Sequence, residues 1–147
     1  MDGKNPALES DYPYWSGGTG VKQVCNFSES IASAVSVQTF VQVEQNSASG
    51  MKAALEYKPL AVSIEADMDV FRTYSSGVLD SISCGTKLDH AVLAVGYGKD
   101  EETGLDYWLI KNSWNTTWGD KGYVKLAVVD GEGTCGVQME PLMAFTN

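Results

Sequence analysis

Asp89-His90-Ala91-Val92-Leu93-Ala94-Val95-Gly96-Tyr97-Gly98 is the stretch that decides the fold, together with Lys111-Asn112-Ser113-Trp114 a short way downstream. The first segment carries the only histidine of the chain on a run of apolar residues that is typical of a strand. The second brings a carboxamide at the end of the next β-rich run. An imidazole on one strand and a carboxamide on the next can hold the histidine in one tautomer, which nucleophilic catalysis requires. The two segments therefore predict a catalytic site whose nucleophile has to be found.

The length and charge of the chain exclude several classes of protein. With 147 residues it can form one domain with a hydrophobic core. Its 10 basic and 19 acidic residues give a net charge of -9, and no basic cluster offers a surface for nucleic acid. No apolar run approaches the roughly 20 residues that span a bilayer. We therefore expect neither a nucleic-acid partner nor a membrane partner.

The remaining pattern predicts a mainly β lobe. Residues 35–43 alternate apolar and polar side chains, which indicates a strand with one buried face. Ser47 suits the N-cap of a helix over 48–58, and Asp67 suits the cap of a short helical turn. Further strands are expected at 60–66, 91–97, 107–111 and 122–129, followed by an irregular end. We therefore expect one α+β lobe over residues 1–147 with no internal boundary, made mainly of an antiparallel, barrel-like sheet with one short helix and long loops.

Two features indicate passage through a secretory pathway. Asn26-Phe27-Ser28 and Asn115-Thr116-Thr117 fit the acceptor pattern for N-glycosylation. The odd number of cysteines points to a thiol whose partner lies outside the chain, because secreted domains usually pair their cysteines. The three cysteines also lack the close paired spacing of a zinc site, and we expect no metal and no cofactor.

Three linked motifs carry a resemblance to a known family. A lone histidine in an apolar strand is more often a hydrogen-bonded core residue than a catalyst. Here the histidine segment is followed by Tyr107-Trp108-Leu109-Ile110-Lys111-Asn112-Ser113-Trp114 and then by Trp118-Gly119 and Gly122-Tyr123. In this combination the sequence resembles the papain-like cysteine proteases, the family of papain and the lysosomal cathepsins. The resemblance runs from Glu9-Ser10-Asp11-Tyr12-Pro13-Tyr14 to Gly133-Thr134-Cys135-Gly136-Val137, and it covers only the second half of the family's catalytic domain.

The resemblance implies roles for three residues. His90 would be the base that forms an ion pair with the nucleophilic thiolate, Asn112 would orient the ring, and Trp114 would shield their contact from water. The family's nucleophile is a cysteine of its first half. The signature around that cysteine, Cys-Gly-Ser/Ala-Cys followed by an aromatic residue, occurs nowhere in this chain. We therefore expect this chain to hold a base without a nucleophile and to be inactive alone.

The resemblance also implies how the cysteines pair. Cys84 and Cys135 match a disulfide inside the family's second half, whereas the cysteine that matches Cys25 pairs with a cysteine of the first half. One departure concerns Asn115, where the family usually has glycine after Asn-Ser-Trp. Asparagine tolerates left-handed backbone, so the turn can persist, but a glycan there would crowd the primed side of the cleft.

Substrate preference is implied by four further positions. The walls of the family's S2 pocket, which takes the second residue before the cleaved bond, match Ser63, Leu88 and Asp89. The floor of that pocket matches Glu140. A carboxylate there can pair with a basic side chain while apolar walls still admit Phe or Leu, so we expect tolerance of Arg at P2.

Taken together, the sequence predicts the second lobe of a papain-like cysteine endopeptidase, lysosomal or vacuolar or extracellular, with its first lobe absent. The implied partners are a polypeptide substrate, a first half or second chain that carries the nucleophile, and a cystatin-type or propeptide inhibitor. Two alternatives stay open. One is a catalytically inactive relative, a pseudoenzyme that acts as a binding or structural component. The other is one chain of a two-chain protease that is held by a disulfide of Cys25.

Overall fold

The computed structural model describes residues 5–28, 32 and 34–146, and the chain forms two compact units. The smaller unit contains residues 1–40 and 144–147, and the larger contains residues 41–143. In the smaller unit, the segment before β1 is made of loops and includes one turn of 3-10 helix, η1 (Trp15–Gly17). Tyr12 closes these loops, because its hydroxyl accepts a hydrogen bond from the backbone N–H of Asn26 (3.0 Å). The prediction of one lobe without an internal boundary stays a prediction.

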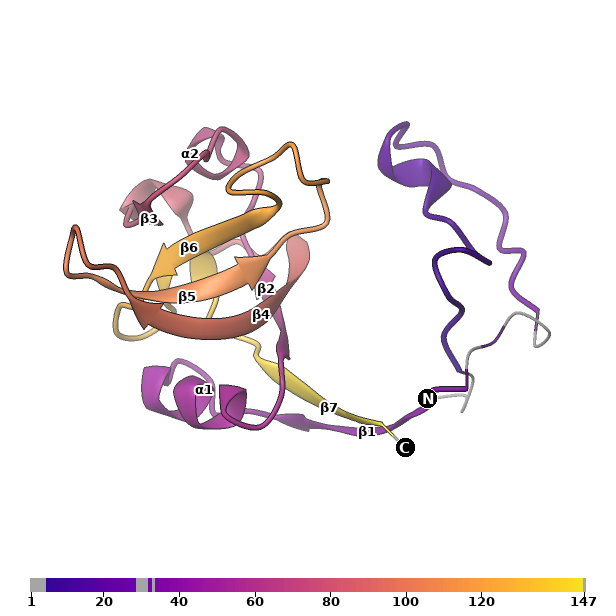
Figure 1. The fold of residues 1–147 in the computed structure, drawn as a ribbon, viewed down its shortest axis with the longest axis horizontal. Helices are drawn as coiled ribbons and strands as arrows, with labels where there is room; N and C mark the ends of the chain where they lie inside the picture. Colours follow the sequence, from indigo (N-terminus) through magenta and orange to yellow (C-terminus); the bar gives the residue numbers. More distant parts are fainter. Residues whose placement is uncertain (1–4, 29–31, 33, 147) are drawn as a thin grey trace. The chain divides into compact units, whose positions relative to one another are not determined.

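The main element of the fold is a seven-stranded sheet (Figure 1). Its strand order is β1-β7-β2-β4-β5-β6-β3. The pairs β2–β4, β4–β5 and β5–β6 are antiparallel, whereas β3 runs parallel to β6. The predicted α+β class with a mainly antiparallel sheet is therefore confirmed. The strands are β1 (Val37–Gln42), β2 (Leu60–Ile64), β3 (Val78–Leu79), β4 (His90–Lys99), β5 (Asp106–Lys111), β6 (Tyr123–Ala127) and β7 (Leu142–Thr146).

The helices of the larger unit are short. α1 (Ala48–Leu55) begins where predicted, because the Ser47 hydroxyl accepts a hydrogen bond from Gly50 N (3.1 Å), and it lies beside β4 in Figure 1. α2 (Asp69–Arg72) begins after Met68, and no side chain caps it. The predicted cap at Asp67 was therefore wrong. Two single turns of 3-10 helix complete the unit, η3 (Ile82–Cys84) and η4 (Thr134–Gly136).

Two further expectations need correction. The alternating segment at 35–43 does form β1, but the strand has no buried residue, and Val41 is 52% exposed. Strand β1 pairs with β7 at the end of the sheet, and alternation alone cannot show whether anything packs on the strand's face. The end of the chain, expected to be irregular, forms β7, and a backbone bridge joins Leu142 to Ala61 of β2.

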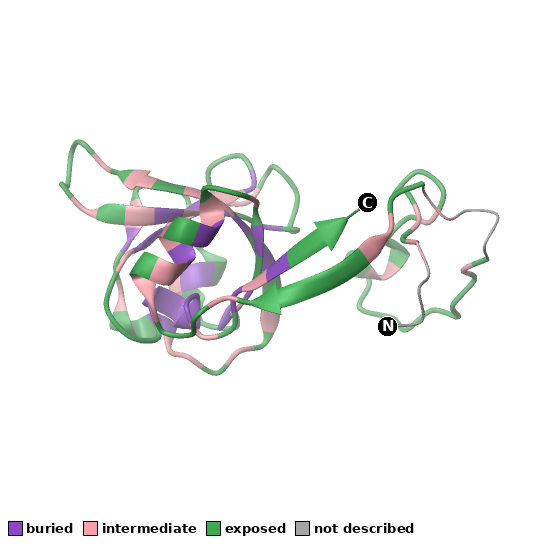
Figure 2. Ribbon diagram, turned by 90° about the horizontal axis from the view of Figure 1, so that it is seen from below, coloured by how far each residue is buried: buried purple, intermediate pink, exposed green. Residues whose placement is uncertain are grey.

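The hydrophobic core lies within the larger unit, where the buried residues gather in Figure 2. Strands β2, β4, β5 and β6 alternate buried and more exposed positions over most of their length, as strands with one covered face should. The largest buried side chain is Trp108, whose indole N–H donates to Gln138 Oε1 (3.0 Å). A disulfide joins Cys84 to Cys135 in this core.

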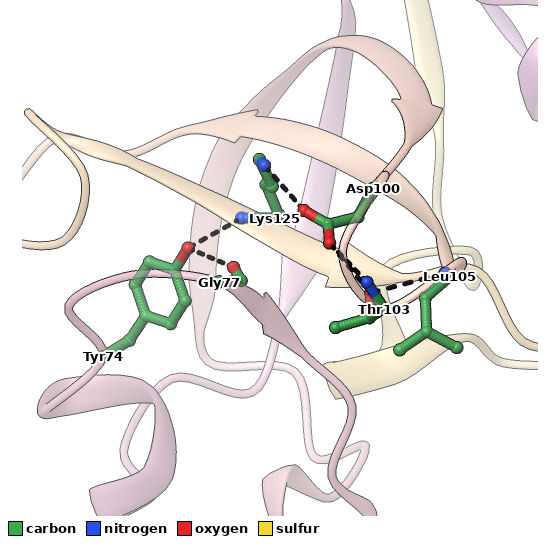
Figure 3. A network of polar contacts seen from close by, with 6 residues as sticks. All are labelled: Tyr74, Gly77, Asp100, Thr103, Leu105 and Lys125. Carbon is green, nitrogen blue, oxygen red and sulfur yellow. Dashed lines mark hydrogen bonds and ion pairs between the residues drawn. The ribbon is translucent and has the colours of Figure 1, made fainter.

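A polar network links the end of α2 to the sheet (Figure 3). The buried Tyr74 hydroxyl donates to Gly77 O (2.6 Å) and accepts from Lys125 N (3.4 Å). The Lys125 ammonium forms an ion pair with Asp100 (3.1 Å), whose other oxygen accepts from the N–H and the hydroxyl of Thr103. The network therefore holds the turn between β4 and β5 against β6.

No helix in the described part of the chain is long and apolar enough to cross a membrane.

Candidate active site

The register of three strands brings His90 and Asn112 together. His90 begins β4 and pairs with Ile64 of β2. In the β4–β5 pair, Leu93 lies opposite Lys111, the last residue of β5. Because the pair is antiparallel, the residue after Lys111 must lie beside the first residues of β4. Asn112 is that residue, and its backbone N–H donates to Gly122 O (2.9 Å) in the segment that leads into β6.

The side chains of this pair are hydrogen-bonded. His90 Nε2 lies 2.9 Å from Asn112 Oδ1, which also accepts the backbone N–H of Ser113 (2.7 Å). The backbone N–H of Ser113 can only donate, so the Asn112 atom that it meets is the amide oxygen. Since an amide oxygen only accepts, the proton must sit on Nε2 of His90. The other ring nitrogen, Nδ1, is then left to accept a proton from a reacting group.

Aromatic rings enclose the contact on one side. The Trp114 ring lies over the His90 ring, with a centroid separation of 5.0 Å and an interplanar angle of 31°. Edge-to-face contacts join Trp114 to Phe71 of α2 (5.5 Å) and to Trp118 (5.4 Å). The Trp118 indole N–H donates to the carbonyl of Arg72 (3.0 Å). This packing fixes Trp114 beside His90, and the hydrogen-bond partner of His90, Asn112, is buried, with only 8% exposed.

A shallow hollow of about 390 Å³ opens beside His90. Its charged residues were not all anticipated, because Arg72 and Asp67 lie on elements far from the histidine motif in the sequence. No sequence signal marked Arg72, which follows a buried aromatic residue in a four-residue helix. The lining residues are Ala66, Asp67, Arg72, Asp89, His90 and Trp114.

Of the four residues expected in the S2 pocket, the structure brings Ser63 and Glu140 into contact. The Ser63 hydroxyl donates to Glu140 (3.4 Å), although 77 positions separate them. Leu88 packs onto the segment before Glu140, since a Cβ at Gly136 would lie 2.7 Å from Leu88 Cδ2. Asp89 differs, because its carboxylate accepts the backbone N–H of Ala66 (2.8 Å) and it lines the hollow beside His90.

The expected modification sites lie on exposed loops. Asn26 and Asn115 are both exposed, and Asn115 adopts a left-handed backbone with φ of 70°. The side-chain oxygen of Asn115 accepts the N–H of Thr116 (2.6 Å), which stabilises the turn without glycine. Cys25, in the smaller unit, is also exposed.

Sequence reasoning missed Glu65, a carboxylate that is only 7% exposed at the end of β2. It stands next to Ile64, which pairs with His90, and its carboxylate accepts the backbone N–H of Lys87 (2.5 Å). An acidic residue directly after a run of apolar strand residues was the available signal.

Comparison with known proteins assigns the family. The sequence model of the papain family of cysteine proteases matches residues 3–145. The chain belongs to the papain family. The fold of this chain is also similar to that of solved papain-family structures. The bromelain protease from Ananas comosus, solved in complex with the E64 inhibitor, superposes on this chain with a TM-score of 0.82 at 34% identity. That match covers 96% of this chain and 63% of bromelain.

Other members of the papain family are similar over most of this chain. A probable cysteine protease of Arabidopsis thaliana, RD21B, is 42% identical over 134 residues, which are 90% of this chain. The oryzain beta chain of Oryza sativa subsp. japonica is 41% identical over 89% of this chain. The ragweed pollen allergen Amb a 11, a cysteine protease solved in its proform, superposes with a TM-score of 0.83 at 33% identity, over 97% of this chain and 42% of the allergen. This chain spans only 27% of the length of RD21B and of oryzain beta.

Proposed function

We propose that this chain is the second lobe of a cysteine endopeptidase and supplies the base of its active site. The observation that carries the proposal is the 2.9 Å contact between His90 Nε2 and Asn112 Oδ1, covered by the ring of Trp114. This arrangement favours the tautomer with its proton on Nε2, orients the ring and leaves Nδ1 as a base. Membership of the papain family supports the same reading.

The nucleophile comes from a first lobe. The papain signature around the catalytic cysteine is absent from this sequence, and two of its three cysteines are joined in a buried disulfide. The length relation supports the proposal as well, because the chain matches 63% of bromelain while covering 96% of itself. By itself, this chain holds a base and its orienting amide, and it is inactive.

In the assembled enzyme, His90 moves the protons of the reaction. Nδ1 takes the proton of the cysteine thiol, and the resulting thiolate attacks the carbonyl carbon of the peptide bond. The imidazolium then gives that proton to the leaving amine as the carbon–nitrogen bond breaks. In the second stage His90 takes a proton from water, whose oxygen displaces the thiol from the acyl-enzyme. Asn112 holds the ring in place through both stages.

The substrate is a polypeptide, and its P2 side chain lies against Ser63, Leu88 and Glu140. Contact between Ser63 and Glu140 (3.4 Å) supports this placement. A carboxylate among these walls favours Arg at P2 more than an apolar pocket would. Asp89, which is expected in the same pocket, lines the hollow beside His90.

The compartment is vacuolar, lysosomal or extracellular, where disulfides persist. The buried Cys84–Cys135 bridge supports this, and the exposure of Asn26 and Asn115 allows glycosylation. Regulation by a propeptide or a cystatin-type inhibitor fits a papain-family site, and Amb a 11 was solved in its proform.

Turnover by the native protein tests the proposal. Intact mass and N-terminal sequencing of the protein purified from its source define the polypeptide that contains this chain. That protein should hydrolyse peptides with Arg or Phe at P2, and His90→Ala should abolish hydrolysis, whereas Gln45→Ala, an exposed control, should not. A folded native protein that carries a cysteine-bearing first lobe but cleaves no peptide would favour the alternative of an inactive binding component.

A further inference from the structure

Glu65 is a buried carboxylate that the proposed reaction does not use. It is 7% exposed and follows β2 directly. Its backbone N–H donates to Cys135 O (2.9 Å), and its carboxylate accepts the backbone N–H of Lys87 (2.5 Å). Its carbonyl oxygen lies 3.5 Å from Cys84 Sγ, a sulfur that belongs to the disulfide and carries no proton. One residue therefore contacts both segments that the disulfide joins.

The loop after Cys84 is shaped around this carboxylate. Gly85 has φ of 72°, a left-handed backbone that favours glycine. A Cβ at Gly85 would collide with the Glu65 side chain, whose Cδ would lie 2.8 Å away. The loop therefore passes with its backbone directly against the carboxylate. A buried carboxylate that accepts a backbone N–H makes a charge-assisted hydrogen bond, which is stronger than a neutral one.

The segments that meet at Glu65 carry the proposed walls of the P2 pocket. Leu88 follows Lys87, the residue bound by the carboxylate, and its side chain packs on Gly136. Glu140 follows Cys135, the residue bound by the Glu65 N–H. Ser63, which donates to Glu140, lies in β2 two residues before Glu65. Each of the three wall residues therefore lies on a segment that contains Glu65 or is hydrogen-bonded to it.

We infer that Glu65 is a positioning residue for P2 specificity: it clamps the loop with Leu88 to the segment that leads to Glu140, and so sets the spacing of the pocket walls. The inference rests on the proposed function. The clamp acts on the pocket more than on the base, because His90 is held separately by its pairing with Ile64 and by Asn112. Loss of the clamp therefore changes selectivity and KM while leaving the chemical step nearly intact.

The test uses Glu65→Gln and Glu65→Ala in the native protease that contains this chain. Gln keeps the shape and one acceptor oxygen, whereas Ala removes the bond to Lys87 and leaves only the backbone bond to Cys135. Glu102→Gln makes the same chemical change at an exposed glutamate, and Glu140→Ala shows whether the pocket reads P2 at all. Hydrogen exchange measured by mass spectrometry follows residues 85–89, and kcat and KM are measured for substrates that differ only in Arg or Phe at P2.

Glu65→Ala should raise exchange over residues 85–89 about tenfold and reduce the Arg/Phe ratio of kcat/KM about tenfold, mainly through KM. The kcat should change less than about threefold, since the base is held elsewhere. Glu65→Gln should restore most of the selectivity, and Glu102→Gln should match the wild type.

An unchanged Arg/Phe ratio in Glu65→Ala overturns the inference, provided that Glu140→Ala does alter the ratio. A wild-type protein without activity contradicts the proposed function instead, and unchanged exchange in Glu65→Ala then still overturns the clamp. If Glu65→Ala does not fold, Glu65→Gln and Glu65→Asp are compared instead, since Asp shortens the side chain. The inference is overturned if selectivity and exchange equal those of the wild type in both variants.

Discussion

Asn112 binds His90 in an asymmetric way. Its side-chain oxygen accepts two N–H groups, from His90 and Ser113, whereas its Nδ2 is buried with no partner among the described residues. An unsatisfied buried polar group destabilises a fold by about 1–3 kcal/mol. An apolar residue of similar size would avoid that penalty, so the amide is kept here for its acceptor oxygen. This is the expected pattern at a functional site.

Removing this acceptor should lower activity without removing the base. We predict that Asn112→Ala lowers kcat/KM of the native protease by about 10- to 100-fold, because a hydrogen bond to the imidazolium that forms during reaction is worth about 1.5–3 kcal/mol. Steady-state kinetics on one peptide substrate measure the loss. Gln45→Ala serves as the exposed control. Full activity in Asn112→Ala would show that the ring is oriented without the amide.

Glu140 should set the preference for a basic residue at P2. Its carboxylate is exposed and contacts Ser63, so a guanidinium in the pocket can reach it. We predict that Glu140→Ala lowers kcat/KM for Arg at P2 by about tenfold, the value of a partly solvated charge-assisted contact, and barely changes it for Phe. Paired substrates measure the ratio, with Glu132→Ala as an exposed acidic control. The idea fails if the Arg/Phe ratio stays the same.

How far the sequence predicts the site depends on the kind of interaction. His90, Asn112 and Trp114 lie in motifs with fixed spacing, and the structure brings their side chains together. Glu65 and Arg72 have no such motif. Their contacts arise from loops that return from distant parts of the chain, and no local pattern encodes which backbone N–H will meet a carboxylate.

At the scale of elements, periodicity predicts the strands that have one covered face. β2, β4, β5 and β6 each overlap a predicted strand, and their ends differ from the predicted ends by only a few residues. β3 and β7 were missed because β3 is only two residues long and β7 is mostly exposed, so neither shows a repeating pattern. The buried face expected for β1 was wrong because burial depends on what packs against a strand.

The turn between β4 and β5 is tied down by one carboxylate. The backbone N–H of Thr103 contributes most to lowering the pKa of Asp100, followed by the Lys125 ammonium and the Thr103 hydroxyl. Together they lower this pKa from 3.8 to about 2. Burial of Tyr74 raises the pKa of its phenol above the ordinary 10.0, and the hydroxyl donates to Gly77. The turn and β6 are thus joined by charged and neutral groups (Figure 3).

This network predicts a loss of stability in acid. Since the folded pKa of Asp100 is depressed, the ionised group stabilises the fold above its unfolded pKa of 3.8, and that contribution disappears as the pH falls toward about 2. Asp100→Asn should therefore have a lower urea midpoint than wild type at pH ~6, and the difference should shrink between pH ~4 and ~2. Glu101→Gln, an exposed neighbour, is the control. A difference that does not vary with pH would assign the effect to shape alone.

At the scale of the whole molecule, much apolar surface is exposed. In the smaller unit, Trp15 is 75% exposed and Val24 is 80% exposed, and both line a hollow of about 600 Å³. Burying one such side chain contributes about 1.5–3 kcal/mol, and contiguous apolar surface of this kind marks sites of protein contact. Burying these exposed apolar side chains against another protein surface would therefore be favourable.

We predict that the chain produced alone associates with itself or with a bound partner. Light scattering should give a mass above that of one chain, and the mass should fall toward one chain on dilution because a reversible association dissociates by mass action. Replacing Trp15 and Val24 by Ser should shift the protein toward monomer, since these side chains supply the buried area. Ile82→Ser is a matched control, because Ile82 is fully exposed but lies in the larger unit, beside Asp80 and Asp130. A monodisperse monomer at all concentrations would contradict the prediction and would show that the exposed aromatic loops are stable in water without a partner.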